Sequence, residues 1–252
     1  IVKAVVVSDG TVYAGGMFTL AGGVTANGIA KWDGSAWSAF GSGMIGGFGV
    51  VVNVLAVSGG DLYAGGARFQ AGRSVAKWNG TSWSALGSGI FGGVVTALAV
   101  SGSDLYVGGL FGSPDGTTDS ANLAKWDGSA WSSLSTGSMS GSVSALAVSR
   151  GGLYVGGTFS MIGGIDARNI ARWDGTRWSA VGSGANTTVA ALAADHRGQL
   201  FVGGFFGLAG SMASPFVAKV VFPYASFQIG DTVNLTLDFL KLEAGETIRI
   251  LG

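Results

Sequence analysis

Cysteine is absent from this 252-residue chain, and histidine occurs once. The chain therefore has no disulfide, no thiolate nucleophile and no cysteine-based zinc site, and a metal centre built from histidines is excluded by count. Charged side chains make up 11% of the residues, less than half of the roughly 25% typical of a soluble domain. Basic and acidic side chains number 14 each, so no net charge attracts nucleic acid or an anionic membrane surface.

Long hydrophobic runs and helical patterns are missing as well. No apolar run approaches the roughly 18 residues of a membrane-spanning helix, so we expect no membrane insertion. No stretch of ten or more residues has helical periodicity. Proline occurs three times and glycine 47 times, without the Gly-X-Y period of collagen. The 48% hydrophobic content argues against a disordered chain.

The chain contains an internal repeat of about 47 residues. Tryptophan pairs with five-residue spacing occur at Trp32 and Trp37, Trp78 and Trp83, Trp126 and Trp131, and Trp173 and Trp178. The first members of these pairs lie 46, 48 and 47 residues apart. An aromatic residue followed by a small residue and Gly-Gly occurs at Tyr13, Tyr63, Tyr106, Tyr154 and Phe201. A period of this length is typical of β-propeller blades.

Each repeat has the pattern of four short antiparallel strands, which we call a to d. In the fourth repeat, strand a is Ala145–Val148, strand b is Leu153–Gly157, strand c is Ile170–Trp173 and strand d is Trp178–Val181. Asp174-Gly175 lies between strands c and d, and Asp-Gly between apolar stretches is a strong hairpin signal. A single sheet of this kind is apolar on both faces, so it needs a neighbour on each side.

The sequence thus predicts an all-β protein, a five-bladed β-propeller of four-stranded antiparallel repeats with a short β C-terminal tail. The propeller is expected over residues 1–230, with blades at about 1–47, 48–93, 94–141, 142–187 and 188–230. Residues 231–252 are expected to form a β-hairpin tail or to begin a truncated further domain. The chain starts with Ile1, inside strand a, which suggests a processed or truncated product.

The repeat resembles the kelch family of propeller repeats. The resemblance is carried by the Gly-Gly after strand b and by the aromatic residues on both sides of the c–d turn. The resemblance covers residues 2–222 in five copies, the last of which lacks both tryptophans. Glycine-rich Trp-Asp-Gly repeats are also similar to those of large secreted bacterial surface proteins. The blade count and length are similar to those of the five-bladed tachylectin-type lectin. These resemblances imply an interaction scaffold outside the cell or on its surface, since kelch-like propellers are mostly scaffolds.

Candidate catalytic groups are better explained by turns. The G-x-G-x-x-G matches at 41–46 and 87–92 join strands d and a, whereas a dinucleotide site needs a helix after the glycines. His196 and the Asp-Gly acids lie in predicted turns. Loop 113–119 could hold calcium through Asp115 and Asp119, but a solvated loop is the favoured interpretation. We therefore expect no enzyme activity and no cofactor.

The b–c loops provide the candidate binding surface, because loops on a rigid scaffold often carry function. They are long and apolar, with these candidate contact residues: Met17, Leu20, Phe69, Leu110, Met161, Phe205, Leu208 and Met212. A basic residue before each strand-c aromatic (Lys31, Lys77, Lys125, Arg172, Lys219) could bind anions fivefold, but we favour a solubilising role.

Three functions are compatible with the sequence. The favoured one is a non-catalytic extracellular or cell-surface scaffold that binds surface proteins or other copies of itself, because little charge opposes association. A glycan-binding lectin with one site in each blade is the alternative. A propeller glycosidase or lyase is the weakest, because no acid lies in the inner strands where a catalytic pair is expected.

Overall fold

The computed structural model describes residues 1–41, 50–67, 69, 73–90, 92–114, 121–134, 139–195 and 197–220. All 25 regular elements in these ranges are β-strands. The predicted tail and three of the residues weighed above, Asp115, Asp119 and His196, lie outside the described residues. The prediction of an all-β chain of antiparallel sheets is confirmed for the part that the structure describes.

Five sheets follow one another along the chain, and each predicted blade range holds one of them except that β15 starts one residue early. The first sheet contains β1 (Val2–Ser8), β2 (Thr11–Gly16), β5 (Ile29–Trp32) and β6 (Trp37–Ala39). The second contains β7 (Val51–Ser58), β8 (Asp61–Ala67), β9 (Val75–Trp78) and β10 (Trp83–Ser84). The third contains β11 (Val94–Ser101), β12 (Asp104–Leu110), β13 (Leu123–Trp126) and β14 (Trp131–Ser132).

The fourth and fifth sheets follow the same order. The fourth contains β15 (Gly141–Ser149), β16 (Gly152–Phe159), β19 (Ile170–Trp173) and β20 (Trp178–Ala180). The fifth has three described strands, β21 (Val189–Ala194), β22 (Leu200–Gly204) and β25 (Val217–Val220). Three small hairpins lie in b–c loops: β3–β4 (Leu20–Ala21, Val24–Thr25), β17–β18 (Met161–Ile162, Ile165–Asp166) and β23–β24 (Leu208–Ala209, Met212–Ala213).

The predicted hairpin between strands c and d is confirmed in four sheets. The two tryptophans of each pair face one another across the turn, as Trp173 and Trp178 do with ring centroids 5.2 Å apart. The Asp174 carboxylate accepts hydrogen bonds from the backbone N–H groups of Thr176 and Arg177 and from the Thr176 hydroxyl. This Asx turn fixes the register of the two strands.

Three of these turns make folding stability depend on pH. The turn hydrogen bonds, foremost that from the Ala36 N–H at Asp33, lower the pKa values of Asp33, Asp127 and Asp174 to about 2. Because the folded-state pKa lies below the ordinary aspartate value of 3.8, the unfolded chain binds more protons between these two pH values. The stabilisation is therefore present above about pH 4 and is lost as the pH falls towards 2.

Replacing all three aspartates by asparagine is expected to flatten this pH dependence without breaking the turns. Asn79 already occupies the same position in the second sheet, where its side-chain oxygen accepts bonds from the Thr81 and Ser82 N–H groups, each 3.0 Å long. Chemical unfolding of both proteins at pH 2, 3, 4 and 6 measures the slope. Equal slopes for the two proteins would show that the turn carboxylates are not the source.

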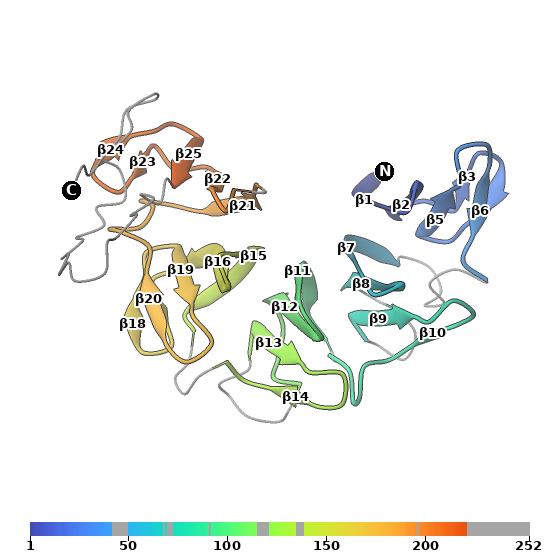
Figure 1. Cartoon of the computed structure of the whole chain (residues 1–252), viewed down its shortest axis with the longest axis horizontal. Helices are drawn as coiled ribbons and strands as arrows, with labels where there is room; N and C mark the ends of the chain where they lie inside the picture. The colour runs from blue at the N-terminus through green and yellow to red at the C-terminus, as the bar shows by residue number, and fades with distance from the viewer. Residues whose placement is uncertain are drawn as a thin grey trace, which may run out of the picture.

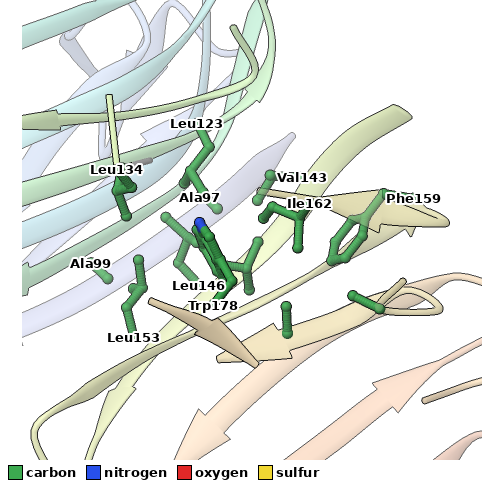
Figure 2. Packing of buried hydrophobic residues seen from close by; sticks show 13 residues of the cluster. Ala97, Ala99, Leu123, Leu134, Val143, Leu146, Leu153, Phe159, Ile162 and Trp178 are labelled. Carbon is green, nitrogen blue, oxygen red and sulfur yellow. The ribbon is translucent and has the colours of Figure 1, made fainter. Parts of the chain in front are cut away.

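Neighbouring sheets pack face to face through a valine placed on a glycine. In the fourth sheet, Val143, Leu146 and Leu153 pack with Ala97 and Leu123 of the third sheet in one buried cluster (Figure 2). The glycine is required because a Cβ added at Gly156 would lie 2.5 Å from Cγ1 of Val189 in the next sheet. The first glycine of each Gly-Gly pair therefore admits the inner strand of the following sheet.

The five sheets form an arc whose first and last members lie apart (Figure 1). Each inner strand has its main inter-sheet contacts with the next one along the chain, β1 with β7, β7 with β11, β11 with β15 and β15 with β21. The arrangement is that of a β-propeller-like fold. The predicted closed ring is not seen in the described residues, because the outer face of β1 is exposed at Val2, Val5 and Val7.

Candidate functional site

The b–c loops and d–a linkers meet at one end of every sheet, which we call the loop end. The register places them together: in the first sheet, the start of β1 pairs with the end of β2, as Val2 does with Gly16. Backbone hydrogen bonds join the two kinds of segment, from Ser140 N–H to the Met161 carbonyl and from Asn186 N–H to the Leu208 carbonyl. At the fourth and fifth sheets, the b–c loop and the preceding linker are thus bonded to each other through the backbone.

Seven of the eight predicted contact residues are exposed at the loop end. They are Met17, Leu20, Leu110, Met161, Phe205, Leu208 and Met212. Phe69 is instead buried, with 3% of its surface exposed, and it packs with Phe40, Val52 and Leu62 in the core between the first and second sheets. Phe69 therefore cannot contact a ligand in this structure and leaves the candidate set.

The burial of Phe69 matches that of the phenylalanines beneath the other loops. Four phenylalanines stand two residues after Gly-Gly; Phe111, Phe159 and Phe206 are buried, as the repeated Phe predicts, whereas Phe18 is only partly buried. Phe69 stands three residues after its Gly-Gly pair. The signal that could have found this was the phenylalanine that recurs after Gly-Gly, and the one extra residue before Phe69 concealed it.

Two exposed apolar residues of the loop end were missed by the sequence analysis. Val24 lies on β4, and Phe216 precedes β25 with 63% of its surface exposed. Phe216 has a φ angle of +69°, which is unusual for a bulky residue. Asn122 and Asn169 occupy the corresponding places in the third and fourth sheets, also at positive φ, and their amides bond to the d–a linkers. Phe216 has no such amide.

The five basic residues considered for anion binding contact other side chains of the chain instead. Lys77 forms a 2.6 Å ion pair with Asp61, and Lys125 forms a 3.2 Å pair with Asp104. The hydrogen bond that Lys77 donates to the Asp61 carboxylate raises the pKa of Lys77. The cationic groups of Lys77 and Lys219 also lie 5.8 Å and 5.6 Å from the ring centres of Tyr63 and Phe201, within cation–π range. Cations held in this way are poorly placed to bind anions in a fivefold manner.

Acid–base groups do not converge in the described part of the chain, where no three His, Cys, Asp or Glu residues come together. The depressed pKa values belong to exposed turn aspartates. Burial raises the pKa values of Tyr106 and Tyr154, which are therefore neutral phenols at pH 7. Strand β11 (Val94–Ser101) follows the glycines at 87–92, so the helix that a dinucleotide site needs is not there.

A cleft at the loop end lies between the b–c loop of the fourth sheet and the linker to the fifth. Its volume is about 630 Å³, and its lining consists of Thr158, Phe159, Ser160, Arg168, Asn169, Ala185, Asn186, Thr187 and Thr188. The volume is in the range of small-molecule sites. The lining combines hydroxyl and amide groups with the cationic Arg168 and the apolar Phe159 and Ala185.

Comparison with known proteins supports the fold and leaves the family open. No family model matches the chain, and no curated protein sequence matches it. A solved structure of the extracellular domain of a hybrid two-component system from B. thetaiotaomicron is similar at a TM-score of 0.57 and 12% identity, over 89% of this chain and 28% of that one. An extracellular domain described as that of a one-component system from B. thetaiotaomicron is similar at 0.51 and 15%, over 80% and 25%.

These likenesses show the fold alone, because the identities are low. The chain spans only about a quarter of the length of each neighbour. No helix among the described residues is long and apolar enough to cross a membrane.

Proposed function

We propose that this chain is a kelch-like β-propeller domain that acts outside the cell or on its surface as a non-catalytic scaffold for protein interactions. The observation that carries the proposal is the row of exposed apolar side chains at the loop end. Met17, Leu20, Leu110 and Met161 are 46%, 60%, 60% and 42% exposed, although the sheets behind them are tightly packed. Exposed apolar side chains gathered on a polar, rigid framework are typical of a protein-binding surface.

The sparse charge supports the same function. Two of the few cations are held in ion pairs with neighbouring aspartates, so the surface offers little repulsion to an approaching protein. The extracellular neighbours in the comparison are compatible with a location outside the cell. Labelling of intact source cells with a membrane-impermeant amine reagent is expected to modify this chain.

A loop-end variant tests the scaffold function. Glutamine at Met17, Leu20, Leu110 and Met161 is expected to reduce saturable binding of biotinylated cell-surface proteins from the source organism by at least tenfold. The cause is the loss of apolar contact area, since these side chains are exposed and their replacement leaves the core intact. Pull-down on immobilised chain, over a concentration series, measures the binding.

The matched control carries four glutamines at the opposite end of the first three sheets, at Ala36, Ser82, Ser103 and Ala130, all exposed. It is expected to bind surface proteins like the natural chain. Equal loss in both variants would contradict the loop-end assignment. Binding to a glycan array without any retention of protein would instead favour a lectin, with the cleft beside Asn169 as its site.

A further inference from the structure

The outer face of the first sheet is apolar, and nothing in the part of the chain that the structure describes covers it. Val2, Val5 and Val7 of β1, which we call the leading face, are 57%, 61% and 63% exposed. The residues at the register position of Val2 in the later sheets, Val52, Val95, Val143 and Val189, are at most 1% exposed. Each of them is covered by the preceding sheet, which the first sheet does not have.

No segment within the described residues covers the outer face of the fifth sheet either. We call Phe201, Gly203 and Val217 the trailing face. The side chain of Val217 is 64% exposed. The residues at its register position, Ile29, Val75, Leu123 and Ile170, are at most 5% exposed. In the earlier sheets this face is covered by the following sheet.

The two uncovered faces are the two halves of one contact. A Cβ at Gly15, Gly65 or Gly156 would lie 2.5 Å from Cγ1 of the valine that the next sheet places on it, and Gly108 receives Val143 in the same manner. At Gly203 the nearest atoms to an added Cβ are the Ala191 Cβ at 3.7 Å and the Phe216 carbonyl at 3.8 Å, both in its own sheet. Val2 therefore lacks a glycine to sit on, and Gly203 lacks a valine.

We infer that the leading and trailing faces together form a docking site for additional four-stranded sheets of this same repeat. The occupant presents a valine on its inner strand to Gly203 and a glycine pair on its second strand to Val2. This reproduces the contact that already occurs four times within the chain. The inference extends the proposed scaffold function to a second surface, and it rests on sheet packing rather than on the loop end.

Closure by the five sheets alone is disfavoured by how tightly they pack. Val52, Val95, Val143 and Val189 are almost completely buried on their glycines, and packed interiors transmit such constraints rather than absorb them. Bringing Val2 to Gly203 requires a changed rotation at all four contacts. A second copy of the chain would join the two faces between molecules, and the experiment below distinguishes that outcome by an intermolecular disulfide.

The experiment combines a cysteine pair with inserted repeats. Val2→Cys and Gly203→Cys introduce the only two thiols of the chain. At Gly15, Gly65 and Gly156, the added Cβ lies 3.1–3.3 Å from the valine Cβ, a few tenths of an ångström below the usual disulfide range. The insertion variants carry a second copy of residues 143–188 directly after Thr188. The linker between sheets is unchanged, because Val143 and Val189 occupy equivalent register positions in the fourth and fifth sheets.

The natural-length V2C/G203C chain is expected to stay monomeric with free thiols. With one, two or three inserted repeats, an intramolecular disulfide should form in most molecules once the opening is filled. The cysteine-free chain with the number of inserted repeats that fills the opening should have a Tm on the order of 10 °C above that of the natural-length chain, because both faces become buried. Gly203→Val should abolish this gain and leave the natural-length chain unchanged. Thiol titration, non-reducing electrophoresis and calorimetry measure these results.

Three results would overturn the inference. An intramolecular disulfide at natural length means that five sheets close on themselves, and an intermolecular one means that a second copy is the occupant. Folded insertion variants that never form the disulfide mean that the faces do not accept such sheets. If the inserted fourth repeat does not fold, a copy of residues 95–142 inserted after Ser142 provides the same test. Loss of loop-end protein binding leaves all three readouts unchanged, so the two proposals fail separately.

Discussion

Gly156→Ala is expected to lower the free energy of unfolding by about 3 kcal/mol, the upper part of the usual range for overpacking a core. The new Cβ would lie 2.5 Å from Cγ1 and 3.2 Å from Cβ of Val189, and 3.3 Å from Cδ1 of Leu192. Both partners belong to the inner strand of the next sheet, so relief of the clash requires the fourth and fifth sheets to separate. Urea unfolding followed by tryptophan fluorescence measures the change.

Gly203→Ala is the matched control, because it makes the same change at the same strand position of the last sheet. An added Cβ there has its nearest neighbour at 3.7 Å, and alanine is favoured over glycine in a strand by roughly 0.5–1 kcal/mol. We expect unchanged or slightly increased stability at low protein concentration. A double variant with Val189→Ala should recover part of the Gly156→Ala loss, since the two sites are in contact. Equal losses at both glycines would contradict the valine-on-glycine packing.

Phe206→Ala is expected to lower the free energy of unfolding by roughly 3–5 kcal/mol, as for a large aromatic removed from a core. Phe206 has no exposed surface and packs in one cluster with Tyr154, Ile170 and Val202. The residue before it, Phe205, is 72% exposed. Phe205→Ala should therefore change stability by less than about 0.5 kcal/mol.

This adjacent pair of residues tests the loop-end surface as well as the core. The same urea titration gives both values, and the side chain removed is identical. A large loss for Phe205→Ala would mean that its ring is covered in solution, which would remove it from the candidate binding surface. Similar small losses for both variants would contradict the burial of Phe206 between the fourth and fifth sheets.

The strands and hairpins could be predicted because they depend on contacts close in sequence. The five-residue spacing of Trp173 and Trp178 and the Asp174-Gly175 between them define a hairpin whose register the side chain of Asp174 completes. Exposure at the loop end followed from the same pattern, except at Phe69. There an additional residue after Gly-Gly hid the equivalence of Phe69 with the phenylalanines that are buried two residues after Gly-Gly.

The sequence by itself determined the repeat and the strand order within each sheet. It did so because backbone pairing and turn conformation are local, and because a repeated pattern repeats the local result. Only the tertiary structure decided that the described residues form an open arc, with Val217 exposed where Ile29 is buried. Ring closure depends on the rotation at each of four sheet contacts, and such rotations come from side-chain packing between distant segments.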